Sequence, residues 1–571
     1  MAVEHGTVHQ PRVAYFSMEI ALEAAIPTYS GGLGVLAGDT LRSAADLGMS
    51  MVAVSLVHRA GYLAQRLDAA GHQSEASASW SPEGVLTEMR ERATIELDGR
   101  PLHLRAWRYD IRGASGDEVG VYLLDTALPE NAPGHRGLTD TLYGGDDRLR
   151  LQQEAVLGLG GVAMLRALGF TDIEVFHSNE GHAALLALGL LREFADGPLT
   201  EVSREAIESV RDRFVFTTHT PVQDGHDTFA MSLVRDTLGE EIAAAIEQFE
   251  CCPPGRLEMT GLALFCARFT NGVSRRHGEV SRLLFPAYPV VSITNGVHAA
   301  TWATPAFQAL FDRSIPDWRQ RNASLRYVAG IPLDEIRKAH ETSKAELLEA
   351  VQRRTGRELS RDVMTIGFGR RATGYKRLDL LFSDLDRLRA IVARVGPLQV
   401  VFAGKAHRSD EIGQHLIRNV FEAASQLGRD LETVYVEDYD MAFGRLLCGG
   451  SDIWLNTPIP PLEASGTSGM KAALNGVPSL SILDGWWVEG HIEGVTGWSI
   501  GDASAEPAGS DADADALYSK LEHVVLPMFY RDPSAFDAIR RSAIALNGSF
   551  FNTERMLLEY EARAYSQPLA E

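Results

Sequence analysis

Short apolar runs rich in β-branched and aromatic residues alternate with helical patterns along the whole chain. In the first half these runs are RVAYFSME (12–19), MSMVAVSLV (49–57), DIEVFHSNE (172–180) and RFVFTTHT (213–220). In the second half they are TIGFGR (365–370), LQVVFAG (398–404), TVYVEDY (433–439), SDIWLN (451–456) and SLSILDGWW (479–487). Such runs separated by helices predict parallel sheets covered on both faces. Because each half has its own set, we expect an α/β fold with two doubly wound domains rather than one barrel.

The chain length also favours two domains. At 571 residues the chain exceeds what one hydrophobic core usually serves. We place the first domain at residues 1–296, and an inter-domain connection, the second domain and a helical tail at residues 297–571. The connection is expected to be helical, because the stretch from about Asn295 to Asp362 has no convincing strand. A strand hairpin is expected near residues 94–111, and a mostly helical tail from Asp511 onward.

Charge and cysteine usage exclude several classes of protein. The formal net charge of −22 opposes binding to nucleic acid or an anionic membrane, since both need clustered Lys and Arg. The N-terminus lacks an apolar signal core and no apolar run approaches the length of a membrane span, so we expect a cytoplasmic protein. Neither a zinc site nor a disulfide framework is indicated, because no C-x-x-C spacing connects the four cysteines, Cys251, Cys252, Cys266 and Cys448.

A turn of small residues follows the run SDIWLN and is expected to bind a phosphate group. The segment Glu463-Ala-Ser-Gly-Thr-Ser-Gly-Met-Lys471 leads into a helical pattern. Such a turn presents backbone N–H groups at the positive end of the helix dipole. Lys471, one turn into the helix, is placed to form a Schiff base with the aldehyde of pyridoxal phosphate. An ordinary strand–turn–helix with a solvated lysine would also fit this local pattern.

A basic cluster follows the run TIGFG. The segment Arg370-Arg-Ala-Thr-Gly-Tyr-Lys-Arg377 has four cations in eight residues. In an acidic protein, such a cluster is repulsive unless an anion or an acidic side chain neutralises it. Arginine and lysine together suit phosphate, one through its fork geometry and the other as a point charge. A solvated basic face is the alternative.

A second glycine-rich turn and several histidines complete the candidate features. The segment Tyr29-Ser-Gly-Gly-Leu-Gly34 precedes a helix expected to start near Val35, and it suits an anion, although a simple tight turn would have the same sequence. Histidines occur in HSNEGH (177–182), HTPVQDGHD (219–227) and TNGVHAATW (294–302), without the H-E-x-x-H spacing of a zinc helix. We therefore expect no metal. The adjacent Trp486 and Trp487 are expected to pack in the core rather than stack on a sugar.

With these residues in view, the chain resembles the α-glucan phosphorylases, the family of glycogen and maltodextrin phosphorylases, and most closely their short bacterial or archaeal branch. The resemblance runs from SGGLGVLAGD through NEGH, TTHTP, NGVSRRHGE, TNGVHAATW, RRATGYKR and AGKAH to EASGTSGMKAALNG. It implies two Rossmann-like domains facing across a cleft, the GT-B glycosyltransferase architecture, and pyridoxal 5′-phosphate as cofactor. It also implies α-1,4-glucan, inorganic phosphate and glucose 1-phosphate as substrates and product, and a homodimer.

The resemblance assigns roles motif by motif. Residues expected at the cofactor are Lys471, Gly466, Thr467, Lys376, Tyr439 and Trp302. Residues expected at the substrates are Gly31, Gly32, Arg370, Arg371, His219, Asn295, Glu463, Ser465 and Gly466. Those expected to take part in catalysis are Lys471, Arg371, Lys376, His219 and Glu463.

The implied activity is phosphorolysis of the terminal α-1,4-linked glucose, giving α-glucose 1-phosphate with retained configuration. Two phosphates in contact repel, which explains the need for a dense cation cluster. Two alternatives stay open from the sequence: a glucan synthase that uses a sugar nucleotide, and a catalytically inactive glucan-binding protein. The chain lacks recognisable segments for phosphorylation or nucleotide control, so no allosteric behaviour is inferred.

Overall fold

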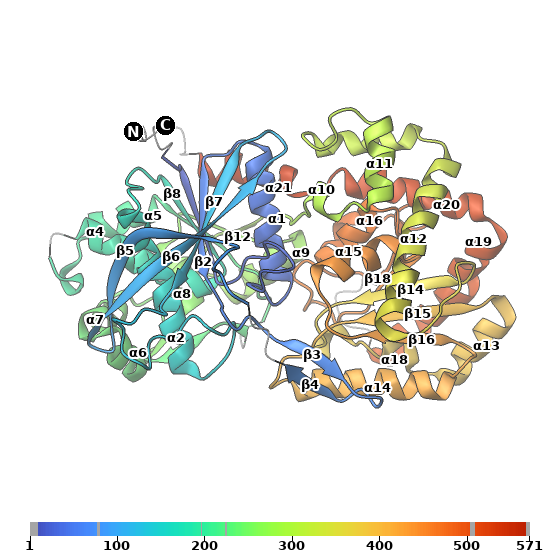
Figure 1. Cartoon of the computed structure of the whole chain (residues 1–571), viewed down its shortest axis with the longest axis horizontal. Coiled ribbons are helices and arrows are strands. Elements are labelled where there is room, and N and C mark those ends of the chain that lie inside the picture. The colour runs from blue at the N-terminus through green and yellow to red at the C-terminus, as the bar shows by residue number, and fades with distance from the viewer. Residues whose placement is uncertain (1–9, 77–79, 196, 223–224, 503–508, 567–571) are drawn as a thin grey trace.

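The computed structural model describes residues 10–76, 80–195, 197–222, 225–502 and 509–566, and these residues form two large β-sheets with separate cores (Figure 1). The first sheet is built from the N-terminal half of the chain and the second from the C-terminal half. Two short two-stranded sheets accompany them, β3–β4 (Ala64–Leu67 and Gln73–Ala76) and β10–β11 (Thr228–Ala230 and Arg256–Glu258).

In the described part of the chain the first sheet has nine strands. Its order is β13 (Val290–Ser292), β12 (Phe269–Gly272), β9 (Phe214–Thr217), β8 (Val175–Asn179), β1 (Val13–Ser17), β2 (Met51–Leu56), β7 (Glu118–Asp125), β6 (Arg100–Arg112) and β5 (Thr87–Leu97). The strands from β13 to β7 pair in parallel, whereas β7, β6 and β5 are antiparallel to one another. The sheet is therefore mixed, with an antiparallel extension at one edge.

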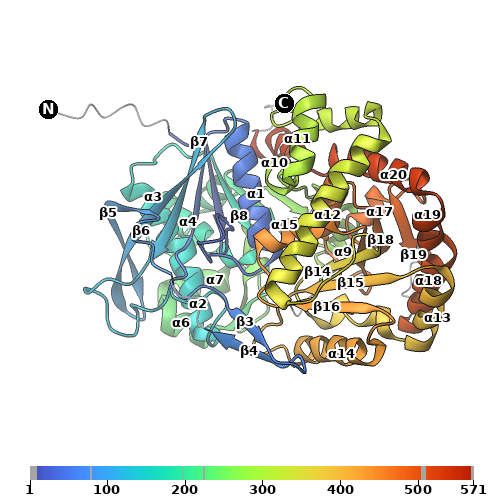
Figure 2. The same ribbon diagram turned by 45° about the vertical axis from the view of Figure 1, so that its right-hand side comes forward.

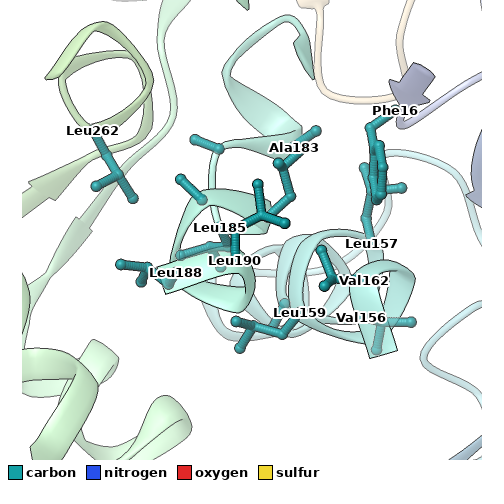
Figure 3. Close-up of a cluster of buried hydrophobic side chains, with 14 of the residues drawn as sticks. Phe16, Val156, Leu157, Leu159, Val162, Ala183, Leu185, Leu188, Leu190 and Leu262 are labelled. Carbon is teal, nitrogen blue, oxygen red and sulfur yellow. The ribbon is translucent and has the colours of Figure 1, made fainter. Parts of the chain in front are cut away.

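The two faces of the first sheet are both buried. Alternate residues of β1 divide between two cores: Phe16 belongs to the core on one face and Tyr15 to the core on the other. Figure 3 shows the first of these cores, where leucines at α4 (Leu186–Phe194), among them Leu185 and Leu190, lie beside Val156 of η1 (Val156–Gly160) and Val162 of α3 (Gly161–Ala167). Burial on both faces explains why these strands are almost wholly apolar.

The second sheet is parallel throughout its described strands. Its order is β16 (Glu432–Val436), β15 (Leu398–Ala403), β14 (Met364–Gly369), β17 (Ile453–Asn456), β18 (Ser479–Ile482) and β19 (Gly497–Ile500). Val401 of β15 packs in a core with helices α12 (Leu333–Thr355) and α15 (Met441–Gly450). Its neighbour Val400 packs in another core with α13 (Leu385–Val395), α14 (Glu411–Leu427) and α18 (Ser510–Lys520). The sheet is thus covered on both faces, and the expected doubly wound α/β fold is confirmed.

Helices connect and cover the two sheets. Those of the first half are α1 (Gly32–Asp46), α2 (Asp147–Ala155), η1 (Val156–Gly160), α3 (Gly161–Ala167), η2 (Gly181–Ala183), α4 (Leu186–Phe194), η3 (Leu199–Glu201), α5 (Arg204–Arg211), α6 (Met231–Leu238), α7 (Glu240–Gln248), α8 (Met259–Cys266) and α9 (Arg275–Leu284). The connection contains α10 (Ala299–Trp302), α11 (Pro305–Ser314), η5 (Asn322–Gly330) and α12 (Leu333–Thr355). The second half adds η6 (Gly374–Lys376), η7 (Leu380–Phe382), α13 (Leu385–Val395), α14 (Glu411–Leu427), α15 (Met441–Gly450), α16 (Thr467–Leu474) and α17 (Trp487–Gly490).

The tail is helical, as expected, and returns to the first sheet. Its elements are α18 (Ser510–Lys520), η8 (Leu521–Val525), α19 (Leu526–Arg531), α20 (Pro533–Ser542), η9 (Ala543–Gly548), α21 (Thr553–Tyr560) and η10 (Glu561–Tyr565). Tyr560 and Tyr565 pack in the same core as Val13 and Tyr15, and Figure 1 shows α21 beside α1. The sequence analysis did not anticipate this docking, and the division at residue 296 stays a prediction.

The strand predictions are confirmed in type and are incomplete in number. Each of the predicted apolar runs contains a strand, and the hairpin predicted at 94–111 is β5–β6. Among the described residues, the predicted runs do not include β7, β12, β13 and β19 of the large sheets, or the strands β3, β4, β10 and β11 of the two small sheets. The helix predicted to start near Val35 begins instead at Gly32, inside the glycine-rich turn, so this start was placed too late.

Candidate active site

The basic cluster lies in the loop that follows β14, and Glu463 neutralises part of it. Lys376 Nζ lies 2.5 Å from Glu463 Oε2, and Arg370 Nη1 lies 3.2 Å from the same oxygen. All three side chains are buried. The expectation that an acidic group accompanies these cations is therefore confirmed, and the acid comes from the other predicted phosphate segment.

Burial and charge shift the pKa values of this group. Burial, helped by the charge of Arg370, lowers the pKa of Lys376 to about 8, and Glu463 keeps it from falling further. Burial raises the pKa of Glu463, but Lys376 and Arg370 outweigh it and hold that pKa below its usual range. Glu463 is thus a carboxylate at neutral pH, and the two cations share one negative charge.

The other two cations of the cluster have different environments. Arg377 is buried, donates to the carbonyl oxygens of Thr457 and Pro458, and pairs with Asp513 at 2.7 Å. It holds the loop in place. Arg371 is exposed and makes no ion pair or side-chain hydrogen bond with any described residue. Of the four cations, Arg371 is the one with its charge available.

The predicted lysine turn forms at the start of α16. Gly466 caps the helix with φ +84°, a conformation that glycine adopts without strain, and Thr467 is the first helical residue. Lys471 is buried, and burial lowers its pKa. Its Nζ lies 3.8 Å from the ring centre of Trp302, whose Nε1 donates to Asp39 of α1 at 2.6 Å. The lysine is therefore held against an aromatic ring and is not solvated, contrary to the alternative that the local pattern left open.

Several buried polar atoms around these two segments have no hydrogen-bond partner among the described residues. They include Ser465 Oγ, Arg370 Nε and Asn295 Oδ1. A buried polar atom without a partner costs free energy, so a group of them indicates a place that a polar ligand completes. Ser465 Oγ and Arg370 Nε can donate to a phosphorylated ligand and Asn295 Oδ1 can accept from a hydroxyl group, so the residues present suit pyridoxal phosphate.

The glycine turn of the first half is open on its outer side. A Cβ atom placed at Gly31 or Gly32 would meet no atom within 4 Å. Glu19 accepts the N–H groups of Ser30 and Gly31 at 2.5 and 3.2 Å, so the Gly31 N–H is already paired. The N–H of Gly32, the first residue of α1, does not donate to Glu19.

His219 and Asn295 follow strands of the first half. His219 Nε2 lies 2.7 Å from Asn179 Oδ1, and its backbone N–H donates to Glu180 at 2.7 Å. Burial lowers the pKa of His219 to about 4, so the ring is neutral and acts by hydrogen bonding. Asn295 donates its backbone N–H to the carbonyl of Val273, and its side-chain Oδ1 has no partner among the described residues, so this oxygen is available to a ligand.

Contacts between the halves bring these groups into one region. Ser274 Oγ donates to the carbonyl of Ala464, next to Glu463, at 2.6 Å. The Met441 N–H donates to Tyr29 Oη at 3.1 Å, and Tyr439, two residues earlier, packs against Gly369 at the end of β14. The site residues predicted from sequence thus come from segments that contact one another across the two halves.

Three supporting acids were missed as site residues. Asp39 fixes Trp302, Glu19 fixes the glycine turn, and Glu180 fixes His219. Asp39 and Glu180 lie within the quoted motifs SGGLGVLAGD and NEGH, so position within a motif was an available signal. Trp486 and Trp487 are buried in the core, as predicted.

Among the described residues there is neither a metal-binding cluster nor a membrane-spanning helix. No group of three or more His, Cys, Asp or Glu side chains there is arranged to hold a metal ion. No helix in that part of the chain is long and apolar enough to cross a membrane.

Comparison with known proteins places the chain in a family. The profile of the carbohydrate phosphorylases matches residues 240–496. A maltodextrin phosphorylase of Thermococcus litoralis is 36% identical over 598 residues, which cover 98% of this chain and 71% of the relative. A glycogen phosphorylase of Aquifex aeolicus is 35% identical over 100% of this chain and 88% of its own length, and one of Mycobacterium tuberculosis is 36% identical over 97% and 70%.

These matches agree with the α/β fold and with its buried, positively charged site. The chain belongs to the carbohydrate phosphorylase family. The resemblance to the α-glucan phosphorylases, drawn from the motifs, is confirmed.

Buried histidines predict that acid destabilises this protein. Burial lowers the pKa to about 4 for His58, His219, His277 and His340, and to about 3 for His177. Between these values and 6.5 the unfolded chain binds protons that the folded chain does not, so stability falls as pH decreases through 6.5 toward 4. Burial raises the pKa values of four carboxyl groups, which oppose part of this loss of stability: Asp140, Glu154, Asp484 and Glu554. Each net proton contributes about 1.4 kcal/mol per pH unit.

Urea unfolding midpoints measured between pH 5 and 7 test this expectation, because most carboxylates do not titrate in that range. A His58→Gln variant keeps a donor for the carbonyl of Met18 and should show a shallower dependence, by about one proton. A midpoint that stays constant from pH 7 to pH 5 would contradict the prediction.

Proposed function

We propose that this chain is an α-1,4-glucan phosphorylase. It transfers the terminal α-1,4-linked glucose of glycogen or maltodextrin reversibly to inorganic phosphate, and it produces α-glucose 1-phosphate with retained configuration. The observation that carries the proposal is the buried Arg370–Lys376–Glu463 group, which has one more positive charge than negative, beside the free charge of Arg371. Family membership supports the same conclusion.

Pyridoxal 5′-phosphate fits the second segment of the site. Lys471 would hold it covalently, the N–H groups of Gly466 and Thr467 would face its phosphate, and Lys376, Tyr439 and Trp302 would line its surroundings. When bound, the cofactor supplies a phosphate group that exchanges a proton with the substrate phosphate. The buried environment that lowers the pKa of Lys471 favours a neutral amine, which is the form that reacts with an aldehyde.

The cations of the β14 loop would hold the reacting phosphate. Arg371 offers a planar fork with no competing partner, and Arg370 and Lys376 add charge in a buried setting where each contact is strong. Glu463 is ionised and tied to two cations, so it is not placed to donate a proton as the acid of a glycosidase does. In this proposal it fixes the cations and accepts hydrogen bonds from the sugar.

The first half would hold the glucose residue. Neutral His219 and the free amide oxygen of Asn295 suit hydroxyl groups, and the unpaired Ser465 Oγ suits another. The open turn at Gly31 and Gly32 leaves room for the phosphate or sugar to approach the backbone. A homodimer and a cytoplasmic location are part of the same proposal and rest on the family resemblance.

The reaction is tested by its product. Purified protein reconstituted with pyridoxal phosphate should release α-glucose 1-phosphate from maltodextrin in a reaction that depends on inorganic phosphate. Enzymatic detection specific for the α anomer, with free glucose measured in parallel, distinguishes phosphorolysis from hydrolysis. Release of the β anomer, or transfer only from a nucleotide sugar, would reject the proposal.

The cofactor assignment is tested by reductive labelling. Borohydride treatment of the protein with pyridoxal phosphate, followed by peptide mass mapping, should place a pyridoxyl group on Lys471. Lys471→Ala should lose both the label and the activity, whereas Lys338→Ala changes an exposed lysine of α12 and should lose neither. A label on another lysine would move the cofactor site.

The phosphate assignment is tested at Arg371. An ammonium group cannot reproduce a planar fork, so Arg371→Lys should cost about 2–4 kcal/mol in phosphorolysis, or about two to three decades in rate. Arg371→Ala should cost at least as much, with pyridoxal phosphate still bound. Arg353→Ala, at an exposed arginine at the end of α12, is the matched control. Rate against phosphate concentration is the measurement, and normal phosphate dependence in Arg371→Ala would place the phosphate elsewhere.

A further inference from the structure

The β3–β4 hairpin belongs to the first half by sequence but lies against the second half. Both views show it beside α14 (Figures 1 and 2). Leu67 packs against the core that lies between the second sheet and α14, and a Cβ atom at Gly71 would lie 2.6 Å from the ring of Phe421. The hairpin is therefore seated closely on the second half.

Gln65 of β3 is fully buried in this contact and uses its side chain on two loops of the second half. Its Nε2 donates to the carbonyl of Gly404 at 2.9 Å, and its Oε1 accepts the N–H of Asp438 at 3.0 Å. Its backbone N–H donates to Asp438 Oδ1 at 3.2 Å. One residue thus ties the loop after β15 to the loop after β16.

Gln73 of β4 completes the arrangement. Its Oε1 accepts from Gln65 Nε2 at 2.8 Å and from the N–H of Ala406 at 3.1 Å, and its Nε2 donates to the carbonyl of Ala406 at 2.9 Å. Lys405, between the contacted residues, donates to the carbonyl of Leu63 at 3.0 Å. The backbone of residues 404–406 is therefore held from the hairpin side.

On the side away from the hairpin, the loop at residues 404–406 contacts the segment 370–377 that contains the basic cluster, here called the cation segment. The Arg370 N–H donates to the carbonyl of Ala403 at 3.1 Å, and the Ala372 N–H donates to the carbonyl of Lys405 at 3.0 Å. A Cβ atom at Gly404 would lie 1.9 Å from the Arg370 carbonyl oxygen, so the two backbones are in direct contact. Arg371 lies between two residues whose main chain this loop fixes.

The second loop leads to Tyr439. Asp438, held at both its N–H and its carboxylate by Gln65, directly precedes this tyrosine. Tyr439 packs against Gly369, one residue before the cation segment begins. Both loops that Gln65 connects therefore contact the ends of the same short stretch, residues 369–372.

We propose that Gln65 is a positioning residue for the phosphate site: from the first half of the chain, it sets the backbone that aims Arg370 and Arg371 at the reacting phosphate. The inference rests on the proposed function, because it concerns the phosphate of that reaction. Gln65 does not touch the substrate. It acts through Gly404 and Asp438.

The expected effect of replacing Gln65 follows from its side-chain amide, which is buried and has hydrogen bonds at both its nitrogen and its oxygen. With Gln65→Leu, a side chain of similar size, the N–H of Asp438 loses its acceptor and the Gly404 carbonyl keeps only Tyr435 Oη as a donor. A buried polar group left unpaired is unfavourable, so the loops would shift to expose it to water. A shift of about 1 Å at a phosphate-binding arginine costs up to about 100-fold in rate.

The matched control is Gln399→Leu. Gln399 is also a buried glutamine with four side-chain hydrogen bonds, to Ser360, Val363 and Thr365, and it lies on β15 at the end far from residue 404. Its loss destabilises the same sheet without touching the cation segment. Gln65→Leu should raise the KM for phosphate about 10- to 100-fold with a smaller change in the KM for maltodextrin and unchanged cofactor content. Gln399→Leu should lower the thermal midpoint and leave the KM for phosphate unchanged.

Amide hydrogen exchange supplies a readout that does not depend on activity. In Gln65→Leu, peptides covering residues 400–410 and 436–441 should exchange faster, followed by the peptide containing residues 369–372, whereas Gln399→Leu should leave all three protected. Gln73→Leu, which removes only the pairing with Ala406 and Gln65, should give the same exchange pattern with a smaller effect. If Gln65→Leu does not fold, the exchange pattern of Gln73→Leu tests the inference in its place.

Two outcomes would overturn the inference. One is a normal KM for phosphate in Gln65→Leu, or an equal change in the Gln399→Leu control. The other is unchanged exchange at residues 369–372 when residues 400–410 open. A wild-type protein without phosphorolysis would reject the proposed function instead, while the exchange data would still show whether Gln65 holds the cation segment.

Discussion

The candidate site depends on a buried cluster in which two cationic side chains share one carboxylate. Arg370 and Lys376 meet at one carboxylate oxygen of Glu463, and all three side chains are removed from water. Burying charges is costly unless they are paired, and here the pairing is incomplete by one negative charge. Burial first, and then the charge of Arg370, lowers the pKa of Lys376 to about 8, although Glu463 lies beside it. An anion is the partner that this group lacks, and this holds in a chain whose formal net charge is −22.

Keeping such a group in place requires backbone support from both halves of the chain. The cation segment is an irregular loop after β14 that hydrogen-bonds to the loop at Gly404. Gln65 of the first half in turn hydrogen-bonds to Gly404. Lys471 has a comparable connection, since it faces Trp302, whose nitrogen is fixed by Asp39 of α1. In both cases the side chain proposed to contact a ligand comes from one half, and a residue of the other half supports it. Contacts between the two halves therefore support both the cation segment and Lys471.

Most of the fold and the position of the site follow from the sequence, because apolar strands buried on both faces are visible as continuous runs. Two of the missed strands lack that signal: β12 (FTNG) and β13 (VVS) are short and partly exposed, β12 pairs with the edge of β9, and β13 pairs in turn with β12. The supporting residues could not be predicted for a related reason. Gln65 lies on a four-residue strand of polar composition, which a sequence pattern presents as exposed, and its burial depends on partners in the other half.

The four cations of the segment 370–377 illustrate the limit of sequence reasoning most clearly, because they are equivalent in the sequence and distinct in the structure. Arg377 faces away from the others and is satisfied by Asp513 and two carbonyl groups, so it stabilises the loop. Arg370 and Lys376 share Glu463, so an anion that binds them meets cations already paired with this carboxylate. Arg371 has no such competitor among the described residues. Charge available for a ligand is therefore concentrated at one arginine, and the accuracy with which the backbone holds residues 370–372 sets how well that charge is used.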